Sequence, residues 1–168
     1  MKRAFCAYLL MAACLLGSPA AAVVDPSGPG SGVRITQLLL DKSARRLYLL
    51  NGKTAVRSYR VDLGSNPAGH KQFRGDGRTP EGLYYITHRN PSSNFFLSLG
   101  ISYPNDQDRA RARGLGRDPG GDIFIHGRGA RVQNPPRDWT RGCAAVTDRE
   151  MAEIFELVQP GTPIFIKP

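Results

Sequence analysis

Apolar side chains recur at every second position along much of the chain, which is the pattern of β-strands that bury one face. The alternation is clearest at residues 33–40, 46–50 and 54–63, and Asn51-Gly52 between the last two is typical of a two-residue hairpin turn. Further strands are predicted at 83–87, 95–102, 122–126, 144–146 and 163–166. The pattern therefore predicts a mostly β chain that opens with an antiparallel meander.

Two segments break the alternation and carry helix signals. Residues 106–113 follow Asn105, whose side chain suits the N-cap position of a helix. Thr147 and Glu150 have the spacing of a capping box, so a second helix is predicted from there to Val158. Short helices among many strands favour a β-sandwich or open barrel with one or two helices packed on it.

The N-terminus has the three-part layout of a secretory signal peptide. Lys2 and Arg3 give a positive start, residues 4–17 form an apolar run, and the small residues at 18–22 fit an Ala-x-Ala cleavage site. The apolar run is shorter than the roughly 20 residues of a comfortable membrane span. An uncleaved anchor helix and lipid attachment at Cys14 are the alternatives to cleavage.

This layout predicts the organisation of the whole chain. Residues 1–22 are expected to be a signal peptide, residues 23–32 a flexible leader rich in Pro, Gly and Ser, and residues 33–168 one folded domain. The protein is therefore expected to be exported to the periplasm or cell envelope. No stable membrane insertion is expected after cleavage.

Composition and charge narrow the class of partner. The chain has 168 residues, of which 40% are hydrophobic and 22% charged, values that exclude a disordered chain, a coiled coil and a multi-span membrane protein. The formal net charge of +9 points to acidic surroundings or an acidic partner. No nucleic-acid partner is expected, because the chain carries an export signal and its Arg-rich stretch at 109–113 lacks interleaved aromatic side chains.

Cleavage after residue 22 would leave Cys143 as an unpaired cysteine in an oxidising compartment, which makes it a candidate for chemistry. His126 ends a predicted strand 17 positions earlier, at the rim where sites are built. A neighbouring imidazole can take the thiol proton, and the thiolate can then attack a carbonyl group. The amides of Gly142 and Cys143 are candidates for an oxyanion hole. A structural thiol and histidine remain the alternative at this point.

The residues around this pair resemble the signature of the L,D-transpeptidase (YkuD-like) catalytic domains. In that family a His-Gly pair precedes a Ser/Thr-x-Gly-Cys motif. The matching residues here are His126-Gly127 and Thr140-Arg141-Gly142-Cys143. The blocks at 79–84, 122–127 and 138–140 also look like those of the family, and the resemblance spans about Val33 to Lys167.

The resemblance implies a murein-modifying cysteine enzyme that needs no cofactor. Cys143 would attack the carbonyl of the third residue of a peptidoglycan stem peptide and expel the terminal D-Ala. His126 would activate the thiol, and the carbonyl of Gly127 would orient the imidazole. The acyl group would then pass to an amine of a second stem peptide, with an envelope protein as a further candidate acceptor.

The neighbours of the cysteine leave the fate of the acyl group open. Arg141 is a candidate for binding a substrate carboxylate, with a solvated loop charge as the alternative, and Thr140 is expected to hold the loop by its hydroxyl. Ala145 stands where many members carry Arg or Asn, so hydrolysis by a carboxypeptidase or amidase competes with transfer. A non-catalytic wall-binding module is the third alternative. His70 and His88 lack ligand neighbours, so no metal is expected.

Overall fold

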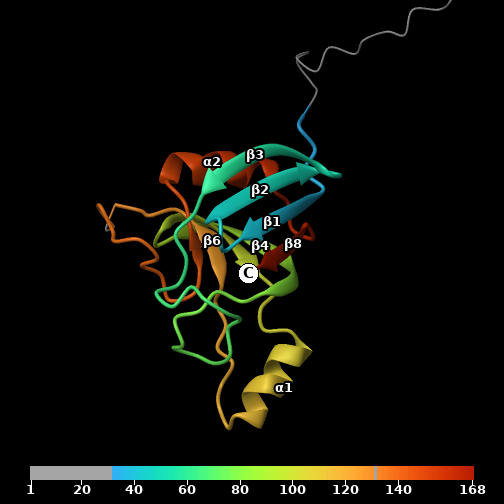
Figure 1. Cartoon of the computed structure of the whole chain (residues 1–168). Coiled ribbons are helices and arrows are strands. Elements are labelled where there is room, and N and C mark those ends of the chain that lie inside the picture. Colours follow the sequence, from blue (N-terminus) through green and yellow to red (C-terminus); the bar gives the residue numbers. More distant parts are fainter. Residues whose placement is uncertain (1–31, 131) are drawn as a thin grey trace, which may run out of the picture. The chain divides into compact units, whose positions relative to one another are not determined.

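The computed structural model describes residues 32–130 and 132–168, and the predicted signal peptide and nearly all of the predicted leader lie outside them. The described chain forms eight strands and two helices (Figure 1). The strands are β1 (Gln37–Asp41), β2 (Arg46–Asn51), β3 (Thr54–Arg60), β4 (Gly82–Ser93), β5 (Phe96–Ile101), β6 (Phe124–His126), β7 (Ala144–Ala145) and β8 (Pro163–Lys167). The helices are α1 (Asp106–Gly114) and α2 (Asp148–Leu157).

The strands form one mixed sheet that closes on itself. Their order is β3-β2-β1-β8-β4-β5-β6-β7, with parallel pairing only between β1 and β8 and between β6 and β7. Asp62, just beyond β3, forms an antiparallel bridge with Ala145 in β7 through N–H···O bonds of 2.9 and 2.8 Å. The two edges of the sheet therefore meet, and the expected mostly β fold of the open-barrel kind is confirmed.

The core lies inside this curved sheet, where alternate residues of the strands point inward. Leu38 and Leu40 in β1, and Ile164 and Ile166 in β8, are almost completely buried. Helix α2, at the top in Figure 1, packs against β5 and β6 and contributes its own apolar face of Met151, Ile154 and Phe155. The capping box of Thr147 and Glu150 begins this helix as predicted.

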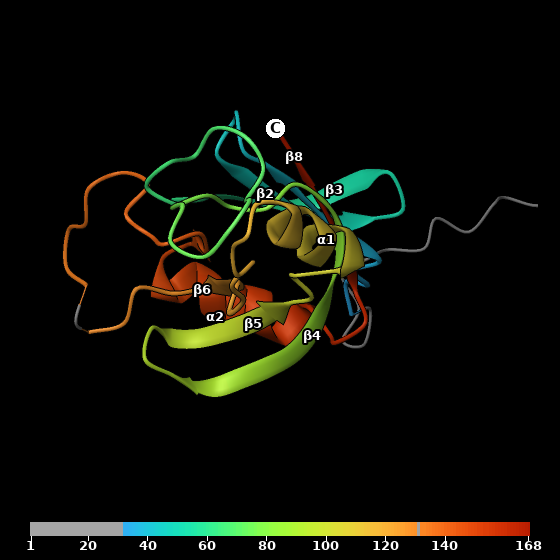
Figure 2. The same cartoon turned by 90° about the horizontal axis from the view of Figure 1, so that it is seen from below.

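Some strand boundaries differ from the predicted ones. The first strand begins at Gln37 rather than at residue 33, and β4 continues to Ser93 instead of ending at residue 87. The extension pairs with β5 in a long hairpin, seen in Figure 2, and contains Pro91. The hairpin has two register shifts, and the second, between Asn90 and Ser93, contains the proline, which lacks a donor for regular pairing. The polar sequence here has no period of two, so alternation could not reveal the strand.

Helix α1 is attached to the sheet by a buried carboxylate. Asn105 and Asp108 form a reciprocal capping box at its start. Asp108 is only 3% exposed and accepts a hydrogen bond of 2.9 Å from the Tyr84 hydroxyl in β4. Figure 1 shows this helix at the end of the domain opposite α2. Neither α1 nor α2 has the length and apolarity that crossing a membrane requires, and the described residues contain no other α-helix.

Candidate active site

The strand register brings Cys143 and His126 to one face of the sheet. Strands β6 and β7 run parallel, with Ile125 opposite Ala144 and His126 opposite Ala145. Side chains two apart on a strand share a face, so Cys143, just before β7, lies on the same face as His126. Both line one cavity of about 300 Å³. Residues 17 positions apart in the sequence are therefore neighbours in one cleft.

The His126 imidazole is held in one orientation by the backbone that follows it. Its Nδ1 lies 2.6 Å from the carbonyl oxygen of Gly127. A carbonyl only accepts, so Nδ1 carries the hydrogen and Nε2 keeps its lone pair. The side chain is 4% exposed, and this burial lowers its pKa below the ordinary value. His126 is thus a neutral base with Nε2 as its acceptor atom.

Two aromatic rings, those of Phe95 and Trp139, surround the imidazole. Their centroids lie 4.7 and 5.8 Å from the centre of the His126 ring. These rings keep water from much of the imidazole and restrict its rotation. Trp139 therefore packs against the histidine.

The carbonyl that orients His126 is itself fixed by a residue that sequence reasoning missed. Asp148, at the start of α2, accepts hydrogen bonds from the N–H groups of Arg128 and Gly129, at 2.6 and 3.0 Å. A Cβ atom at Gly127 would collide with the Asp148 carboxylate, so only glycine fits there. The sequence contained the helix-start signal at Asp148 but nothing that placed it against this loop.

Cys143 lies at the floor of the cleft as a neutral thiol. Burial raises the pKa of its thiol to about 11, and backbone hydrogen bonding and the charge of Lys71 offset only part of this effect. The Sγ atom lies 3.5 Å from the carbonyl oxygen of Asp122, to which the S–H donates. The resting pair is therefore a thiol and a neutral imidazole rather than a thiolate–imidazolium ion pair.

The turn that carries Cys143 is tied by Thr140. The Thr140 hydroxyl donates to the Cys143 carbonyl oxygen at 2.8 Å and accepts from the Gly142 N–H at 3.1 Å. Thr140 therefore holds the loop as expected. The Gly142 N–H, expected at an oxyanion hole, is committed to Thr140, whereas the Cys143 N–H donates to none of the described residues.

Gly142 is required by its backbone geometry. Its φ of +134° lies in the region that side chains rarely adopt, and a Cβ atom there would sit 2.6 Å from the carbonyl oxygen of Arg78. The close approach lets the chain turn so that Cys143 faces the cleft.

The cleft continues on the far side of Cys143 as a cationic hollow. This second cavity, of about 390 Å³, shares Asp122 and Cys143 with the first and is lined by Lys71, Arg74 and Arg141. Apart from the shared Asp122, the first cavity is lined by neutral polar and aromatic side chains. The cysteine therefore lies between two chemically different halves.

The buried Lys71 gives the cationic half a fixed charge. Its side chain is only 3% exposed, and its Nζ is 2.8 Å from Asp76 and 3.2 Å from the carbonyl oxygen of Phe73. Arg141, in contrast, is exposed and has no ion pair within the described chain. Its guanidinium is thus available to a ligand in this hollow.

A family model described as the L,D-transpeptidase catalytic domain (YkuD) matches residues 36–166. The chain belongs to the L,D-transpeptidase catalytic domain family. The resemblance deduced from the His-Gly and Thr-x-Gly-Cys motifs is thereby confirmed.

This L,D-transpeptidase domain spans about half the length of the relatives that it matches. YafK of Escherichia coli (strain K12), provisionally named an L,D-transpeptidase, is 30% identical over 143 residues, 83% of this chain and 52% of YafK. The helical cell shape determining protein Pgp2 from Campylobacter jejuni superimposes with a TM-score of 0.64 at 22% identity, covering 79% of this chain and 47% of Pgp2. Bd1075 from Bdellovibrio bacteriovorus gives 0.56 at 26% identity, covering 80% and 48%.

The remaining histidines of this L,D-transpeptidase domain lie outside the cleft. His70 Nε2 is 3.0 Å from the buried Asp108, and His88 Nδ1 is 2.8 Å from the Thr87 hydroxyl. Within residues 32–130 and 132–168, no three His, Cys, Asp or Glu side chains gather in a group that could hold a metal ion.

The loop that leads to the cysteine is anchored to the domain by Asp138. Its carboxylate accepts hydrogen bonds from Arg45 Nε and Nη2 and, at 3.0 Å, from the N–H of Leu63. Burial by itself raises the pKa of Asp138, but these hydrogen bonds outweigh it and hold the pKa below its ordinary value. The side chain is 11% exposed, so the pair with Arg45 is largely shielded from solvent.

Replacing Asp138 by alanine is expected to lower the free energy of unfolding by about 3 kcal/mol, because three hydrogen bonds to a charged group are lost. Asp138→Asn should cost only about 1–2 kcal/mol, since it keeps an acceptor and tolerates the φ of +54°. The lowered pKa makes this stabilisation present above the unfolded value of about 3.9 and lost as the pH falls further. Urea unfolding of both variants at pH 7 checks the order, and an alanine variant as stable as wild type contradicts it.

Thiol alkylation should report the raised pKa of Cys143. Between about pH 7 and 9.5 the rate with iodoacetamide is expected to rise about tenfold per pH unit without a plateau, because the thiolate fraction keeps growing. N-acetylcysteine, which levels off near its ordinary pKa, is the reference. Labelling of Cys143→Ala corrects for Cys6 and Cys14. A plateau below about pH 8 would indicate a resting ion pair instead.

Proposed function

We propose that this protein is an exported cysteine acyltransferase that performs L,D-transpeptidation on peptidoglycan stem peptides. The observation that carries the proposal is the open cleft on both sides of Cys143, with the oriented base His126 on the same face of the sheet. A transferase needs room for a donor and an acceptor around one nucleophile. Family membership supports this class of reaction.

In the first half-reaction, Cys143 Sγ attacks the carbonyl carbon of the third residue of a stem peptide. His126 Nε2 takes the thiol proton as the bond forms, because the neutral thiol is a weak nucleophile. The N–H of Cys143 is the proposed donor to the tetrahedral oxyanion. The C–N bond then breaks, His126 returns the proton to the leaving D-Ala amine, and a thioester remains.

In the second half-reaction, an amine of another stem peptide attacks the thioester carbonyl. His126 Nε2, neutral again, removes a proton from the attacking amine and passes it to the departing sulfur as the C–S bond breaks, which regenerates the thiol and the neutral imidazole. The product is a new amide cross-link and no redox change occurs. The carbonyl of Gly127 keeps the imidazole oriented through both steps, and Thr140 keeps the turn at Gly142 in place.

The cationic half of the cleft is the proposed binding place for a carboxylate of the stem peptide. Arg141 supplies a free guanidinium fork, which suits a carboxylate, and Lys71 supplies a fixed charge behind it. The aromatic half of the cleft would then hold the other stem peptide. Ala145 is buried beside His126, so it offers the acceptor no charged contact.

The cellular setting follows from this chemistry. An enzyme of stem peptides works in the periplasm or cell envelope, in line with the predicted signal peptide. Its role would be in peptidoglycan biosynthesis and cell shape, and the likeness to Pgp2, a helical cell shape determining protein, agrees with this setting.

The test is incubation of the purified protein with a disaccharide-tetrapeptide, followed by mass spectrometry. Transpeptidation gives a cross-linked dimer with loss of one D-Ala. Tripeptide without dimer would mean that water is the acceptor and the protein is a carboxypeptidase. Absence of either product, with Cys143 still reactive toward iodoacetamide, would overturn the proposal for this donor.

A further inference from the structure

A second hollow outside the catalytic cleft gathers three arginine side chains. It has a volume of about 420 Å³. Its lining includes Arg60 at the end of β3, Arg128 just after β6, and Arg137 in the loop that leads to Cys143. It shares no lining residue with either cavity at Cys143. Thr147, the N-cap of α2, also lines it, so the positive end of that helix adjoins the guanidinium groups.

The arginines of this hollow are only partly satisfied. Arg60 and Arg137 are exposed, and neither forms an ion pair with any residue of the described segments. Arg128 reaches Asp62 only at 3.5 Å, and its buried Nε has no hydrogen-bond partner among the described residues. Buried polar atoms without partners are unusual and call for a ligand or another explanation.

The two acidic residues in the lining, Glu150 and Asp62, reduce the net positive charge of the hollow, but neither forms an ion pair with Arg60 or Arg137. Glu150 is occupied by the capping box, where its carboxylate accepts from the N–H and hydroxyl of Thr147. Asp62 has its long contact with Arg128. The guanidinium groups of Arg60 and Arg137 therefore remain available for an external anion.

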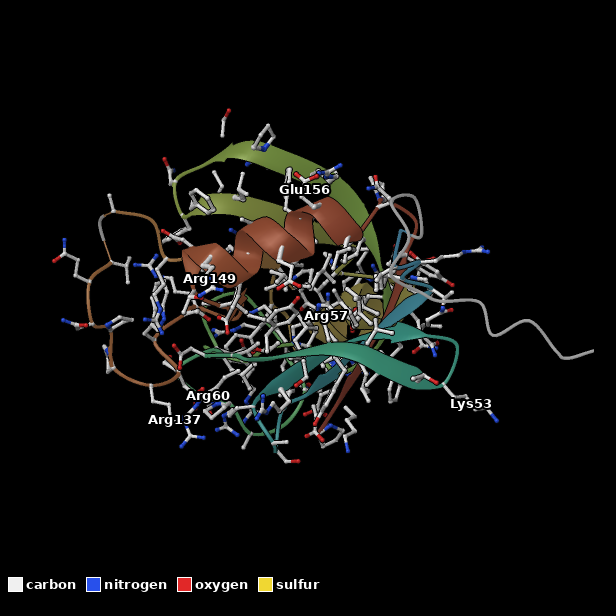
Figure 3. The ribbon with its side chains drawn as sticks, turned by 90° about the horizontal axis from the view of Figure 1, so that it is seen from above. Lys53, Arg57, Arg60, Arg137, Arg149 and Glu156 are labelled. Atoms are coloured by element: carbon white, nitrogen blue, oxygen red, sulfur yellow. The ribbon has the colours of Figure 1, made fainter. Side chains whose placement is uncertain are left out.

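The positive charge extends from the hollow over the adjoining face. Figure 3 shows Arg60 and Arg137 together at one end of this face, Arg149 on the neighbouring α2, and Arg57 and Lys53 farther along β3 and its turn. Only Arg57 forms an ion pair there within the described chain, with Glu153 at 2.6 Å. The hollow is thus the concave end of a basic surface.

We infer that this arginine hollow, defined by Arg60, Arg128 and Arg137, binds a carboxylate of a neighbouring stem peptide on the same peptidoglycan strand. The inference rests on the proposed function, which makes the substrate a polymer with repeated carboxylates. Arginine forks bind carboxylates in a bidentate manner. Binding here would keep the enzyme on the wall while the cleft processes another stem peptide.

A membrane is a less suitable partner for this surface. The exposed large apolar side chains of the described chain, such as Leu83, Phe96 and Phe165, lie outside the lining of the hollow. A helix or face that lies on a bilayer needs apolar side chains to insert. A hollow that takes single anionic groups fits a chain of carboxylates better than a flat layer of headgroups.

The hollow also adjoins both ends of the loop between the two catalytic residues. Arg128 is two residues after His126, and Arg137 is two residues before Trp139, which contacts the imidazole. In Figure 2 the chain leaves β6 and extends along one side of the domain. A carboxylate held by both arginines would therefore link the two ends of the loop.

The test measures binding to isolated peptidoglycan sacculi by pelleting, with all proteins in a Cys143→Ala background so that the sacculi stay unaltered. The pair Arg60→Gln/Arg137→Gln is expected to raise the half-saturating amount of sacculi at least about tenfold. The control pair Arg109→Gln/Arg113→Gln removes the same charge from exposed positions on α1 and should change it less than about twofold. Thermal melting establishes that each pair folds.

Sacculi whose carboxylates have been converted to neutral amides identify the ligand chemistry. On them the difference between parent and Arg60→Gln/Arg137→Gln should disappear. A persisting difference, equal pelleting of parent and variant on native sacculi, or a larger effect on phosphatidylglycerol vesicles would each overturn the inference.

Turnover separates this inference from the proposed function. With Cys143 intact, Arg60→Gln/Arg137→Gln should process a single disaccharide-tetrapeptide at the wild-type rate, because neither arginine lines the cavities at Cys143; a matching loss of turnover would overturn the inference. If the wild type forms no product while pelleting still depends on the two arginines, the proposed reaction fails and the binding site stands.

Discussion

Cys143→Ala is expected to abolish both the cross-linked dimer and the tripeptide, a loss of at least about a thousandfold in rate. Alanine removes the Sγ atom that forms the thioester. The hydroxyl of Ser98, which lies opposite His126 on the same face of the sheet, is a weaker nucleophile than a thiol and should not replace it. The site around it should persist, because Thr140 holds the turn through the backbone of residue 143 rather than through its side chain. Intact-protein mass spectrometry of the wild type should detect the acyl adduct, and the variant should show none.

The other cysteines of the chain provide the matched control. Cys6 and Cys14 lie in the predicted signal peptide, so the double variant Cys6→Ala/Cys14→Ala should process the donor at the wild-type rate. An adduct or product that survives Cys143→Ala would assign the chemistry to another residue. Loss of stability in the variant would show instead that the thiol had a structural role.

The fold was predictable wherever one face of a strand is buried and the other is solvated. The structure follows the sequence signals closely in strands β2, β5 and β8 and in both capped helices. In these elements the spacing of apolar residues, the turn residues and the capping residues all indicate the same structure. The second half of β4 was missed because its residues are polar on both faces and interrupted by Pro91. This part of β4 is a strand because it pairs with β5, and that pairing cannot be recognised from the local sequence.

The candidate site was predictable in Cys143 and His126 but not in the residues that support them. His126, Gly127 and Cys143 were indicated by the resemblance of the His-Gly and Thr-x-Gly-Cys motifs to those of the family. Asp138 and Asp148 act across the fold, through Leu63 N–H and the loop after Gly127. Nothing in the local sequence distinguishes such carboxylates from ordinary surface charges.

The resting charge state connects the fold to the mechanism. Burial raises the pKa of the Cys143 thiol and lowers that of His126, so both shifts favour the uncharged pair. In the proposed mechanism the thiolate therefore forms only as the proton moves to Nε2 during attack. A neutral thiol is less prone to oxidation in the oxidising compartment that the sequence predicts, which suits a proposed nucleophile with no second cysteine among the described residues.

His126→Gln is expected to lower kcat/KM by about a hundredfold to ten-thousandfold, because the thiol loses its general base. The pH profile should change as well. In the wild type, activity needs the neutral imidazole, so it falls as the pH drops through the His126 pKa, which lies below the ordinary value of about 6.5. In the variant this acid limb should vanish, and the residual rate should rise with pH toward the Cys143 pKa of about 11.

The rate and the pH profile together distinguish a general base from a residue that only supports the fold. His88→Gln, at an exposed position outside the cleft, removes the same chemical group and should leave both the rate and the acid limb unchanged. A structural histidine at 126 would lower the rate at every pH and keep the limb. If His126→Gln kept the fall in activity at low pH, the titrating group would be another side chain. That result would contradict His126 as the general base of the proposed mechanism.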